Sequence, residues 1–330
     1  MAKNSAHRGE FWAIGFVLGY ASGNIFDRRA VGGSDPLIGP LLRGLPSLAL
    51  GLALVWKYRT WGQLRPHSDT YIGRRAIVPF VWAGAISTIG LFLYYFAIKL
   101  GGVILTVTVI ETWVIWGTLA AWPMLREELH GYLLAGWGVI VLGLACLVFG
   151  HLRGQSLSHA WYWALPLALL TAMCYGVSGV LWRDGQLRGA HHSTAIFVQF
   201  LTSFAVGIVG LLLYGRGPGL LSTSLQGLID FVSSGVLSGV VGVYCIFKAL
   251  GLLEVARVNA LSSLTPLTAT LFARIFLHEP LSLLTLAGVV VVCTGVALTQ
   301  IMRSRAQKAS VKNPLSMDNS PGSLRLLGSP

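Results

Sequence analysis

The sequence predicts an all-α polytopic membrane protein with ten transmembrane helices, arranged as two inverted five-helix repeats. Three observations support this fold class: low charge, apolar blocks of 20 residues or more, and a second half that resembles the first. Of the 330 residues, 54% are hydrophobic and 11% are charged, and the mean hydropathy is +0.69. A soluble domain carries about 25% charged residues, and a helix needs about 20 apolar residues to cross a bilayer.

Ten apolar blocks are separated by short connections. The expected spans are 11–31, 36–58, 76–100, 102–125, 130–150, 161–187, 193–215, 226–253, 255–281 and 282–303. The first block follows a short basic stretch without a convincing cleavage site, so we expect a retained helix and not a signal peptide. The four cysteines lie inside apolar blocks, where packing is expected rather than disulfides or metal binding.

These spans divide the chain into five parts. They are an N-terminus (1–10), a first five-helix repeat (11–150), a linker (151–160), a second five-helix repeat (161–303) and a tail (304–330). The tail is rich in Ser, Pro and basic residues and holds little to bury. We expect it to be disordered and to lie against anionic membrane lipids.

The formal net charge of +12 follows the expected topology and does not indicate a nucleic-acid partner. On one side of the membrane lie only six of the 24 Lys and Arg residues: Arg28, Arg29, Lys99, Arg153, Arg216 and Arg274. Arg43 falls within a span, and the others lie on the side of the termini. Because basic residues are retained on the cytoplasmic side, both termini are expected there, in the cytoplasmic (inner) membrane of a bacterium.

The two halves align at a shift of 152 residues. This shift places Ala97 on Ala249, Glu127 on Glu279, Gly136 on Gly288 and Gly143 on Gly295. Upstream the shift becomes 156, which places Arg43 on Gln199. Each half holds five spans, and an odd number makes the second half cross the membrane in the opposite sense. Inverted repeats of this kind are typical of secondary transporters, whose substrate site lies near the midplane between the repeats.

Two stretches, LYYFAIKLGGV (93–103) and LTPLTATLFARIFLHEPLSLLTLAGVVVVCTG (264–295), resemble the EamA-type repeat of the drug/metabolite transporter superfamily. The second repeat matches that pattern at Ala249-Leu250, Pro266, Glu279 and Gly288, whereas the first has Val114 at the proline position. Arg43 matches an arginine often found in the second helix of that family. The resemblance implies a ten-helix transporter with cytoplasmic termini, but it does not name a substrate.

Glu111 stands out because it is an acid within the apolar stretch VTVIETWVIWG. It lies about nine residues from the outer end of its expected span, which is ~14 Å deep at ~1.5 Å per residue. Intramembrane acids usually face a cavity or a partner and take part in proton or substrate coupling. In a continuous helix, Thr108 and Thr118 share the face of Glu111, whereas Trp113 projects elsewhere.

The matching face of the ninth span carries Asn259, Ser263 and Thr270, and Ser263 is the repeat counterpart of Glu111. Two polar stripes related by the repeat are what a central substrate site would need. Arg43 and its counterpart Gln199 are possible flanking contacts. Arg43 could bind a substrate carboxylate through two hydrogen bonds, or it could join helices through backbone carbonyls.

Three roles are open for Glu111: coupling to substrate or protons, a structural ion pair with Arg43, and a permanently protonated packing residue. Burial raises the pKa of a carboxyl group, whereas a nearby cation lowers it. A proton and a cationic substrate could therefore compete for Glu111. With a neutral or zwitterionic substrate, Glu111 would instead bind an amino group.

Two acids at span ends, Glu127 and Glu279, are expected to cap the helices that begin at His130 and Ser282. Small residues at Gly235 and Gly239 predict a close helix contact.

Tyr94, Tyr95 and Tyr244 lie at span ends, where interfacial aromatic belts are expected; a gating role is the alternative.

We therefore expect a secondary transporter that exports a small organic metabolite or a drug-like amine in exchange for protons. One alternative is a facilitator for amino acids or nucleobases in which Glu111 orients the substrate. Others are a membrane enzyme acting on lipid or sugar donors, although no catalytic arrangement is evident, and a structural subunit. No cofactor, metal site or ATP-binding motif is expected. The expected partners are the substrate, protons and lipids, and the sequence does not indicate the oligomeric state.

Overall fold

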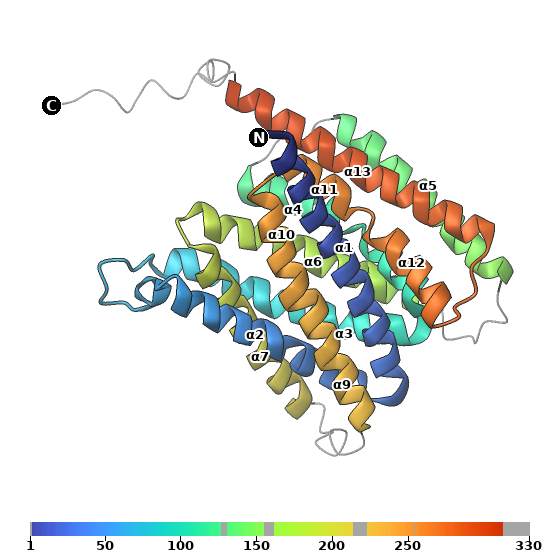
Figure 1. Cartoon of the computed structure of the whole chain (residues 1–330), viewed down its shortest axis with the longest axis horizontal. Coiled ribbons are helices and arrows are strands. Elements are labelled where there is room, and N and C mark those ends of the chain that lie inside the picture. Colours follow the sequence, from blue (N-terminus) through green and yellow to red (C-terminus); the bar gives the residue numbers. More distant parts are fainter. Residues whose placement is uncertain (1, 127–130, 155–161, 214–222, 254, 313–330) are drawn as a thin grey trace.

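The structure is a computed structural model that describes residues 2–126, 131–154, 162–213, 223–253 and 255–312. Helices account for its regular structure throughout these ranges (Figure 1). The α-helices are α1 (Ala2–Gly33), α2 (Gly39–Lys57), α3 (Arg74–Ile110), α4 (Trp113–Leu125), α5 (Gly131–Gly154), α6 (Ala164–Leu187), α7 (His192–Leu213), α9 (Leu225–Ser234), α10 (Val243–Leu250), α11 (Val255–Ser262), α12 (Thr265–Phe276) and α13 (Leu283–Lys312). Short 3₁₀ turns, η1 (Pro36–Ile38) and η2 (Thr60–Leu64), flank α2, and a π-helix, η4 (Gly235–Gly242), joins α9 to α10.

Seven helical segments in the described part of the chain are long and apolar enough to cross a membrane. They are Pro36–Lys57, Arg74–Ile110, Leu133–Leu152, Ala164–Leu187, His192–Leu213, Leu225–Leu250 and Leu283–Arg303. The other three expected spans fall on α1, which carries several charged residues, and on two spans that are broken into shorter helices. The protein is thus an all-helical, multi-pass membrane protein.

The fourth and ninth expected spans are both interrupted near their middle. In the fourth, α3 ends at Ile110 and α4 begins at Trp113; in the ninth, α11 ends at Ser262 and α12 begins at Thr265. At the first break, the N–H groups of Glu111 and Thr112 donate to carbonyls three residues back, which is 3₁₀ geometry. The two breaks, at 111–112 and 263–264, are 152 residues apart, which is the shift of the sequence repeat.

Helix α3 joins the third expected span to the first half of the fourth through a kink at Gly102, where φ is +75° and ψ is −178°. This backbone conformation is essentially restricted to glycine. The kink frees the N–H groups of the segment that follows. Glu279 accepts hydrogen bonds from Val103 N (2.8 Å) and Ile104 N (3.1 Å). The expectation that Glu279 caps the helix after it is therefore wrong, because its carboxylate caps the helix segment after Gly102; Glu127 lies outside the described residues.

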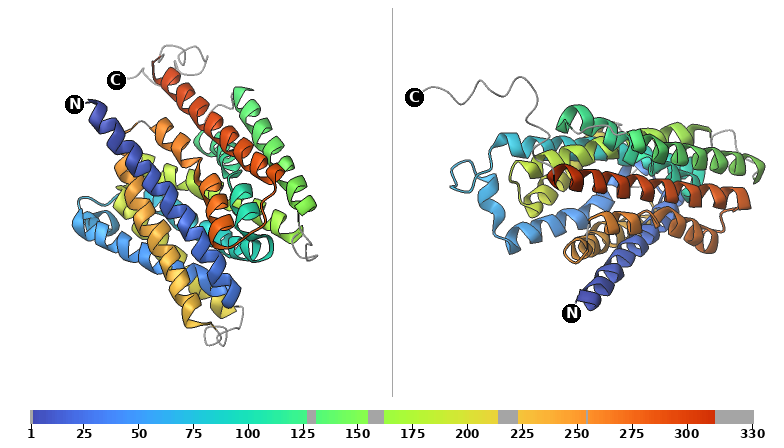
Figure 2. Two further views of the ribbon diagram at one scale, coloured as in Figure 1. Left: turned by 45° about the vertical axis from the view of Figure 1, so that its right-hand side comes forward. Right: turned by 90° about the horizontal axis from the view of Figure 1, so that it is seen from above.

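Helices α5 and α13 pack side by side and antiparallel (Figures 1 and 2). Glycines at seven-residue intervals line the contact. A Cβ added at Gly143 would lie 2.7 Å from Val292 N, and one at Gly288 would lie 2.5 Å from Leu147 N. Helices in a membrane associate through such close backbone contacts, because lipid offers no hydrophobic driving force between them.

The helix contacts form equivalent pairs when α1 is matched with α6, and α3 with α9–η4–α10. Helix α3 packs on α6, and the equivalent contact is that of α1 with α9, η4 and α10. Helix α4 also packs on α6, and the equivalent contact is that of α1 with α12. Helix α2 packs on α7, and α5 on α13. In Figure 1 the N-terminus and the C-terminal end of α13 lie at one end of the molecule, and the start of α9 lies at the other.

The π-helix η4 packs tightly against α2, as the small residues at Gly235 and Gly239 predict. A Cβ at Gly235 would lie 2.4 Å from the carbonyl oxygen of Arg43, and one at Gly239 would lie 2.0 Å from Ser47 Oγ. π-Helical segments are rare in proteins, and those that occur are frequently found at functional sites. This one holds Ser238 against the side chain of Arg43.

Helix α13 continues to Lys312 and so includes the first part of the expected tail, 304–330. The sequence SRAQKASVK (304–312) holds no proline or glycine, and Ala, Arg, Gln and Lys favour helix. The first proline follows at position 314. Residues 313–330 lie outside the described residues.

Candidate functional site

A cavity of about 310 Å³ lies beside the two helix breaks. Helices from both halves of the chain contribute to its wall. The lining residues are Phe16, Tyr20, Asn24, Arg43, Tyr94, Val107, Ile110, Glu111, Trp113, Tyr175, Asn259, Ser262, Ser263, Thr265, Val296 and Gln300. We call this the central cavity. Its α1 residues all precede Asp27, so the cavity lies between that residue and the end of the molecule that carries the termini.

Both helix breaks open onto the central cavity. The last residues of α3 and α11 (Ile110, Ser262) and the first residues of α4 and α12 (Trp113, Thr265) line it. The carbonyl end of a helix favours a cation and the N–H end favours an anion. Broken helices therefore bring polar backbone of both kinds into the membrane, as at the substrate sites of many secondary transporters.

Glu111 lies in the first break, is half-buried and lines the central cavity. Trp113 Nε1 donates a hydrogen bond to Glu111 Oε2 (3.3 Å). Trp113 also lines the cavity, so the expectation that it projects elsewhere is wrong. The 3₁₀ turn at 111–112 has about three residues per turn and shifts the helical phase, which brings Trp113 round to the side of Glu111.

Two polar residues of the ninth span, Asn259 and Ser263, also line the central cavity. Asn259 Nδ2 donates to Gln300 Oε1 on α13 (3.3 Å), and the Ser263 hydroxyl donates to the carbonyl of Ala260 (2.7 Å). The Ser263 hydroxyl proton is thus used within its own helix. The repeat counterparts Glu111 and Ser263 therefore share one cavity.

Three expected site residues, Thr108, Thr118 and Thr270, are not among those that line the central cavity. They are buried, at 0%, 4% and 0% exposure. Thr108 and Thr118 each donate to the carbonyl four residues earlier in their own helix, at 2.7 Å. The expectation that they share the face of Glu111 assumed a continuous helix, and the break invalidates that assumption.

Arg43 forms an ion pair with Asp27 of α1, at 2.5 Å between Nη1 and Oδ2. Its Nη2 donates to Ser238 Oγ of η4 (3.0 Å), and the guanidinium lies 5.8 Å from the centre of the Tyr94 ring. The partner of Arg43 among the described acids is thus Asp27. The alternative of a structural pair between Arg43 and Glu111 is not what the structure shows.

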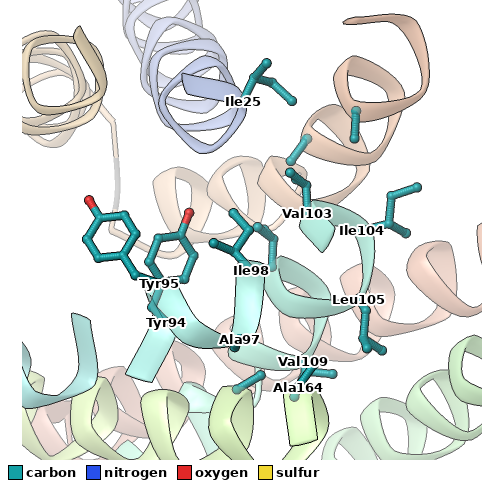
Figure 3. Close-up of a cluster of buried hydrophobic side chains, with 14 of the residues drawn as sticks. Ile25, Tyr94, Tyr95, Ala97, Ile98, Val103, Ile104, Leu105, Val109 and Ala164 are labelled. Carbon is teal, nitrogen blue, oxygen red and sulfur yellow. The ribbon is translucent and has the colours of Figure 1, made fainter. Parts of the chain in front are cut away.

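Asp27 is fully buried and its carboxylate is held by three side chains. Besides Arg43, Tyr94 donates to Oδ2 and Tyr95 donates to Oδ1, each at 3.0 Å. The Tyr94 hydroxyl also lies 3.0 Å from Asn24 Oδ1. Figure 3 shows the two rings projecting from α3, with their hydroxyls directed away from Ala97 and Ala164. Tyr94 (3% exposed) and Tyr95 (0%) are therefore buried hydrogen-bond donors to Asp27 and do not form an aromatic belt. Tyr244, in contrast, is 50% exposed.

A second cavity, of about 370 Å³, lies between α2, α3, α6, α7 and η4. Gln199, the repeat counterpart of Arg43, lines it together with several hydroxyl groups, among them Ser47, Ser87 and Ser203. Tyr20, Arg43 and Tyr175 line both cavities. The two expected flanking residues, Arg43 and Gln199, thus meet at the second cavity and not at the central one.

Sequence reasoning missed Asp27, Tyr20, Tyr175 and Gln300. Asp27 lies within the first expected span, where an acid is a signal in itself, but its neighbours Arg28 and Arg29 make it look like part of a charged helix end. Tyr20 lies in the first helix of the first repeat, and Tyr175 lies in the first helix of the second. When the two repeats are aligned, these tyrosines are one residue out of register. No sequence signal distinguishes them from packing aromatics.

The sequence profile of the EamA-like transporter family matches residues 7–149 and again 162–301. The chain belongs to the EamA-like transporter family. It is 24% identical over 173 residues to the "Probable amino-acid metabolite efflux pump" of Escherichia coli (strain K12), an alignment that covers 52% of this chain and 58% of that protein. A solved crystal structure superposes with a TM-score of 0.56 at 15% identity, over 91% of this chain and 98% of that one, which shows the shared fold alone.

Family membership makes this protein a transporter and not an enzyme. The two profile matches divide the chain at 149 and 162, close to the expected linker. The central cavity, with its broken helices, is therefore the candidate substrate site.

Proposed function

We propose that this EamA-family transporter exports a small organic metabolite that carries an amino group, in exchange for protons at Glu111. The observation that carries this proposal is the charge balance of the central cavity. Among the described residues that line it, Arg43 and Glu111 are the charged ones. Arg43 is paired with Asp27, and no described cation pairs with Glu111. An ionised Glu111 therefore gives the cavity a net negative charge that an ammonium group can balance.

Aromatic side chains of the cavity wall support an amine as substrate. Phe16, Tyr20, Tyr94, Trp113 and Tyr175 come from four different helices and line the same space as Glu111. A cation near the face of an aromatic ring gains about 0.5–2 kcal/mol, with the larger value in a desolvated site. The carboxylate supplies the charge, and the rings supply a surface for the apolar body of the compound.

Exchange follows from the competition of two cations for one carboxylate. A protonated Glu111 no longer attracts an ammonium group, and a bound ammonium group favours the ionised carboxylate. Each binds as the other leaves, so the inward proton gradient drives export. The name of the matched relative, an efflux pump for amino-acid metabolites, agrees with outward movement of an amine-bearing compound.

Alternating access in this proposal uses ten spans in two inverted repeats. The equivalent helix contacts, the twofold profile match and the two breaks 152 residues apart all support that arrangement. The excess of basic residues on the side of the termini supports cytoplasmic ends in a bacterial inner membrane.

The test is flux in proteoliposomes across a panel of amines, amino acids and nucleobases, with and without an imposed pH gradient. We expect at least one amine-bearing compound to move against its gradient, and Glu111→Gln to lower that flux about tenfold or more. Thr294→Val is the matched control, because this exposed hydroxyl of α13 bonds only within its own helix. It should transport like the wild type.

Two results would reject proton exchange. If Glu111→Gln transports as well as the wild type while folding normally, the acid is structural. If wild-type flux depends on Glu111 but the substrate never moves against its own concentration gradient, the protein is a facilitator in which Glu111 orients the substrate.

A further inference from the structure

A pair of aromatic side chains joins α1 to α10 toward the end of the molecule that carries the termini. The rings of Trp12 and Tyr244 meet edge to face, with their centroids 5.6 Å apart. The two helices pack side by side and run in opposite directions (Figures 1 and 2). Trp and Tyr gather at the level of the lipid headgroups, so this contact marks the membrane interface on these helices.

Each helix carries a basic residue one turn beyond this aromatic pair. Arg8 precedes Trp12 by four residues, and Lys248 follows Tyr244 by four. Because the helices are antiparallel, both basic residues lie on the outer side of the rings, toward the termini. Residues four apart share one helix face and are about 6 Å apart along the axis. Lys248 Nζ lies 5.6 Å from the centre of the Tyr244 ring.

The spacing of the two helices places one small anion within reach of both basic side chains. The axes of packed helices are about 8–10 Å apart. Lys and Arg side chains extend over several bonds and can direct their charged ends along a helix surface. Arg8 and Lys248, at the same level on neighbouring helices, can therefore converge on a single phosphate group.

Neither basic residue is neutralised within the described part of the chain. Both side chains are exposed. Glu10, the acid nearest to Arg8 in sequence, is held by Arg257 and His7. The ion pairs of the described residues include neither Arg8 nor Lys248. Two uncompensated positive charges thus lie beside each other, and they complement an anionic group.

An apolar stripe continues from these charges along the surface of α1. Phe11, Ile14 and Leu18 follow one another at helical spacing, and all three are exposed. Phe11 also lines a hollow in the surface together with His7 and Arg8. A phospholipid presents a phosphate next to a hydrocarbon chain, and the same order of charge and apolar surface is present here.

We propose that an anionic phospholipid binds between α1 and α10, with its phosphate held by Arg8 and Lys248 and an acyl chain along Phe11 and Ile14. Each basic residue near a membrane surface strengthens the binding of anionic lipid by about 1 kcal/mol, which is roughly fivefold. The site lies outside the central cavity, and it does not depend on the proposed function.

The bound lipid joins helices of different repeats. Helix α1 is the first span of the first repeat and contributes Phe16 and Tyr20 to the wall of the central cavity. Helix α10 completes the third span of the second repeat. A ligand that binds only the folded arrangement stabilises it by mass action, so the lipid holds α1 against α10 beside the cavity.

Native mass spectrometry of the full chain in mild detergent measures this binding. Phosphatidylglycerol and phosphatidylcholine with identical acyl chains are titrated separately, so that the headgroup alone differs. We expect the first phosphatidylglycerol to bind the wild type at least about tenfold more tightly than phosphatidylcholine. Arg8→Gln with Lys248→Gln should lose this preference, whereas Lys248→Arg should retain it because the charge is kept. Phosphatidylglycerol should also raise the melting temperature of the wild type and not that of the double variant.

Arg65→Gln with Arg75→Gln is the matched control. Both residues are exposed and lie in the connection between α2 and α3 or at the start of α3, so this variant removes the same charge outside the α1–α10 contact. It should bind phosphatidylglycerol like the wild type. If it loses the preference as well, the lipid responds to overall charge and the site is wrong. Displacement of the lipid by an equal concentration of glycerol phosphate would mean a site for soluble phosphates, and a wild type without preference for phosphatidylglycerol would also overturn the proposal.

Discussion

Asp27 and Glu111 are both acids within the membrane-spanning part of the molecule, and their hydrogen bonds suit them to different tasks. Asp27 is fully buried and accepts from Arg43, Tyr94 and Tyr95, whereas Glu111 is half-buried and accepts from Trp113. A carboxylate with several fixed partners holds its neighbours in place. A carboxylate with one weak partner beside a cavity can exchange a proton for a ligand.

The Asp27–Arg43 pair gives a prediction for stability. Removing one partner of a buried ion pair costs about 3–5 kcal/mol, because the other charge stays buried without compensation. We expect Asp27→Asn to lower the free energy of unfolding by an amount in that range, and Tyr95→Phe by about 1 kcal/mol, since one hydrogen bond is lost. The double variant Asp27→Asn with Arg43→Gln should be destabilised by less than the sum of its single variants.

Unfolding of purified protein in mild detergent, followed by thermal or chemical denaturation, measures these differences. Full additivity of the Asp27 and Arg43 variants would show that the two charges are not coupled. Tyr95→Phe serves as the matched variant, because it keeps the ring and its packing and removes only the hydroxyl.

Single residues of the site were predictable where the sequence carries a local anomaly. Glu111 is an acid in an apolar stretch, and Asn259 and Ser263 lie on the equivalent polar stripe; all three line the central cavity. Partners brought together by tertiary structure were not predictable. The bond from Arg43 to Ser238 joins residues 195 positions apart, and nothing in the spacing of either helix indicates it.

At the scale of helices, the segment 103–110 of α3 positions Glu111, since it runs from the kink at Gly102 to the first break. Its N-terminal N–H groups are capped by Glu279, which belongs to the link between α12 and α13. The sequence predicts this cap only in part. It identifies Glu279 as a capping acid, but the helix that it caps lies 176 residues away along the chain.

The kink gives a second prediction for stability. At Gly102 a Cβ would lie 2.7 Å from Glu279 Oε1, and the positive φ disfavours any other residue. Gly102→Ala should therefore cost more than the ~1–3 kcal/mol of backbone strain in this glycine-only region alone, and Glu279→Gln should cost about 0.5–2 kcal/mol as a lost cap. Gly138→Ala on α5, where a Cβ meets nothing within 4 Å, should be neutral or slightly stabilising.

Thermal unfolding of these variants beside the wild type provides the measurement. A neutral Gly102→Ala variant would contradict the backbone conformation at the kink. A Glu279→Gln variant as stable as the wild type would mean that the amide caps Val103 and Ile104 as well as the carboxylate does.

At the scale of the whole molecule, apolar blocks and the repeat predicted an all-helical multi-pass protein, and family membership confirms a transporter. The two breaks were not predicted, because Glu111–Thr112 carries no proline or glycine and Ser263–Leu264 only precedes Pro266. A broken helix inside a membrane depends on neighbours that satisfy its backbone. That support comes from the packing of the other helices, which local sequence does not encode.

Ion pairs distinguish the two ends of the molecule. At the end far from the termini, Arg28 bonds to the Lys99 carbonyl (3.0 Å) and lies 3.8 Å from Glu279, while Arg29 lies 3.6 Å from the buried Asp230. Together with Asp27, these consecutive residues tie α1 to α2, α9 and the α12–α13 link. At the other end, Glu10 pairs with Arg257 between partly exposed side chains, and exposed pairs are worth little.

This asymmetry predicts which side of the membrane reaches the central cavity. In a chain whose four cysteines are replaced, Ser262→Cys in the cavity should react with a membrane-impermeant thiol reagent from the side of the termini and not from the other side. Gly32→Cys, exposed at the far end, should react only from that other side. Adding Arg29→Gln weakens the far-end contacts of α1, so reaction of Ser262→Cys from the far side should rise. Reaction from the far side already in the parent chain would mean that these ion pairs do not close that end.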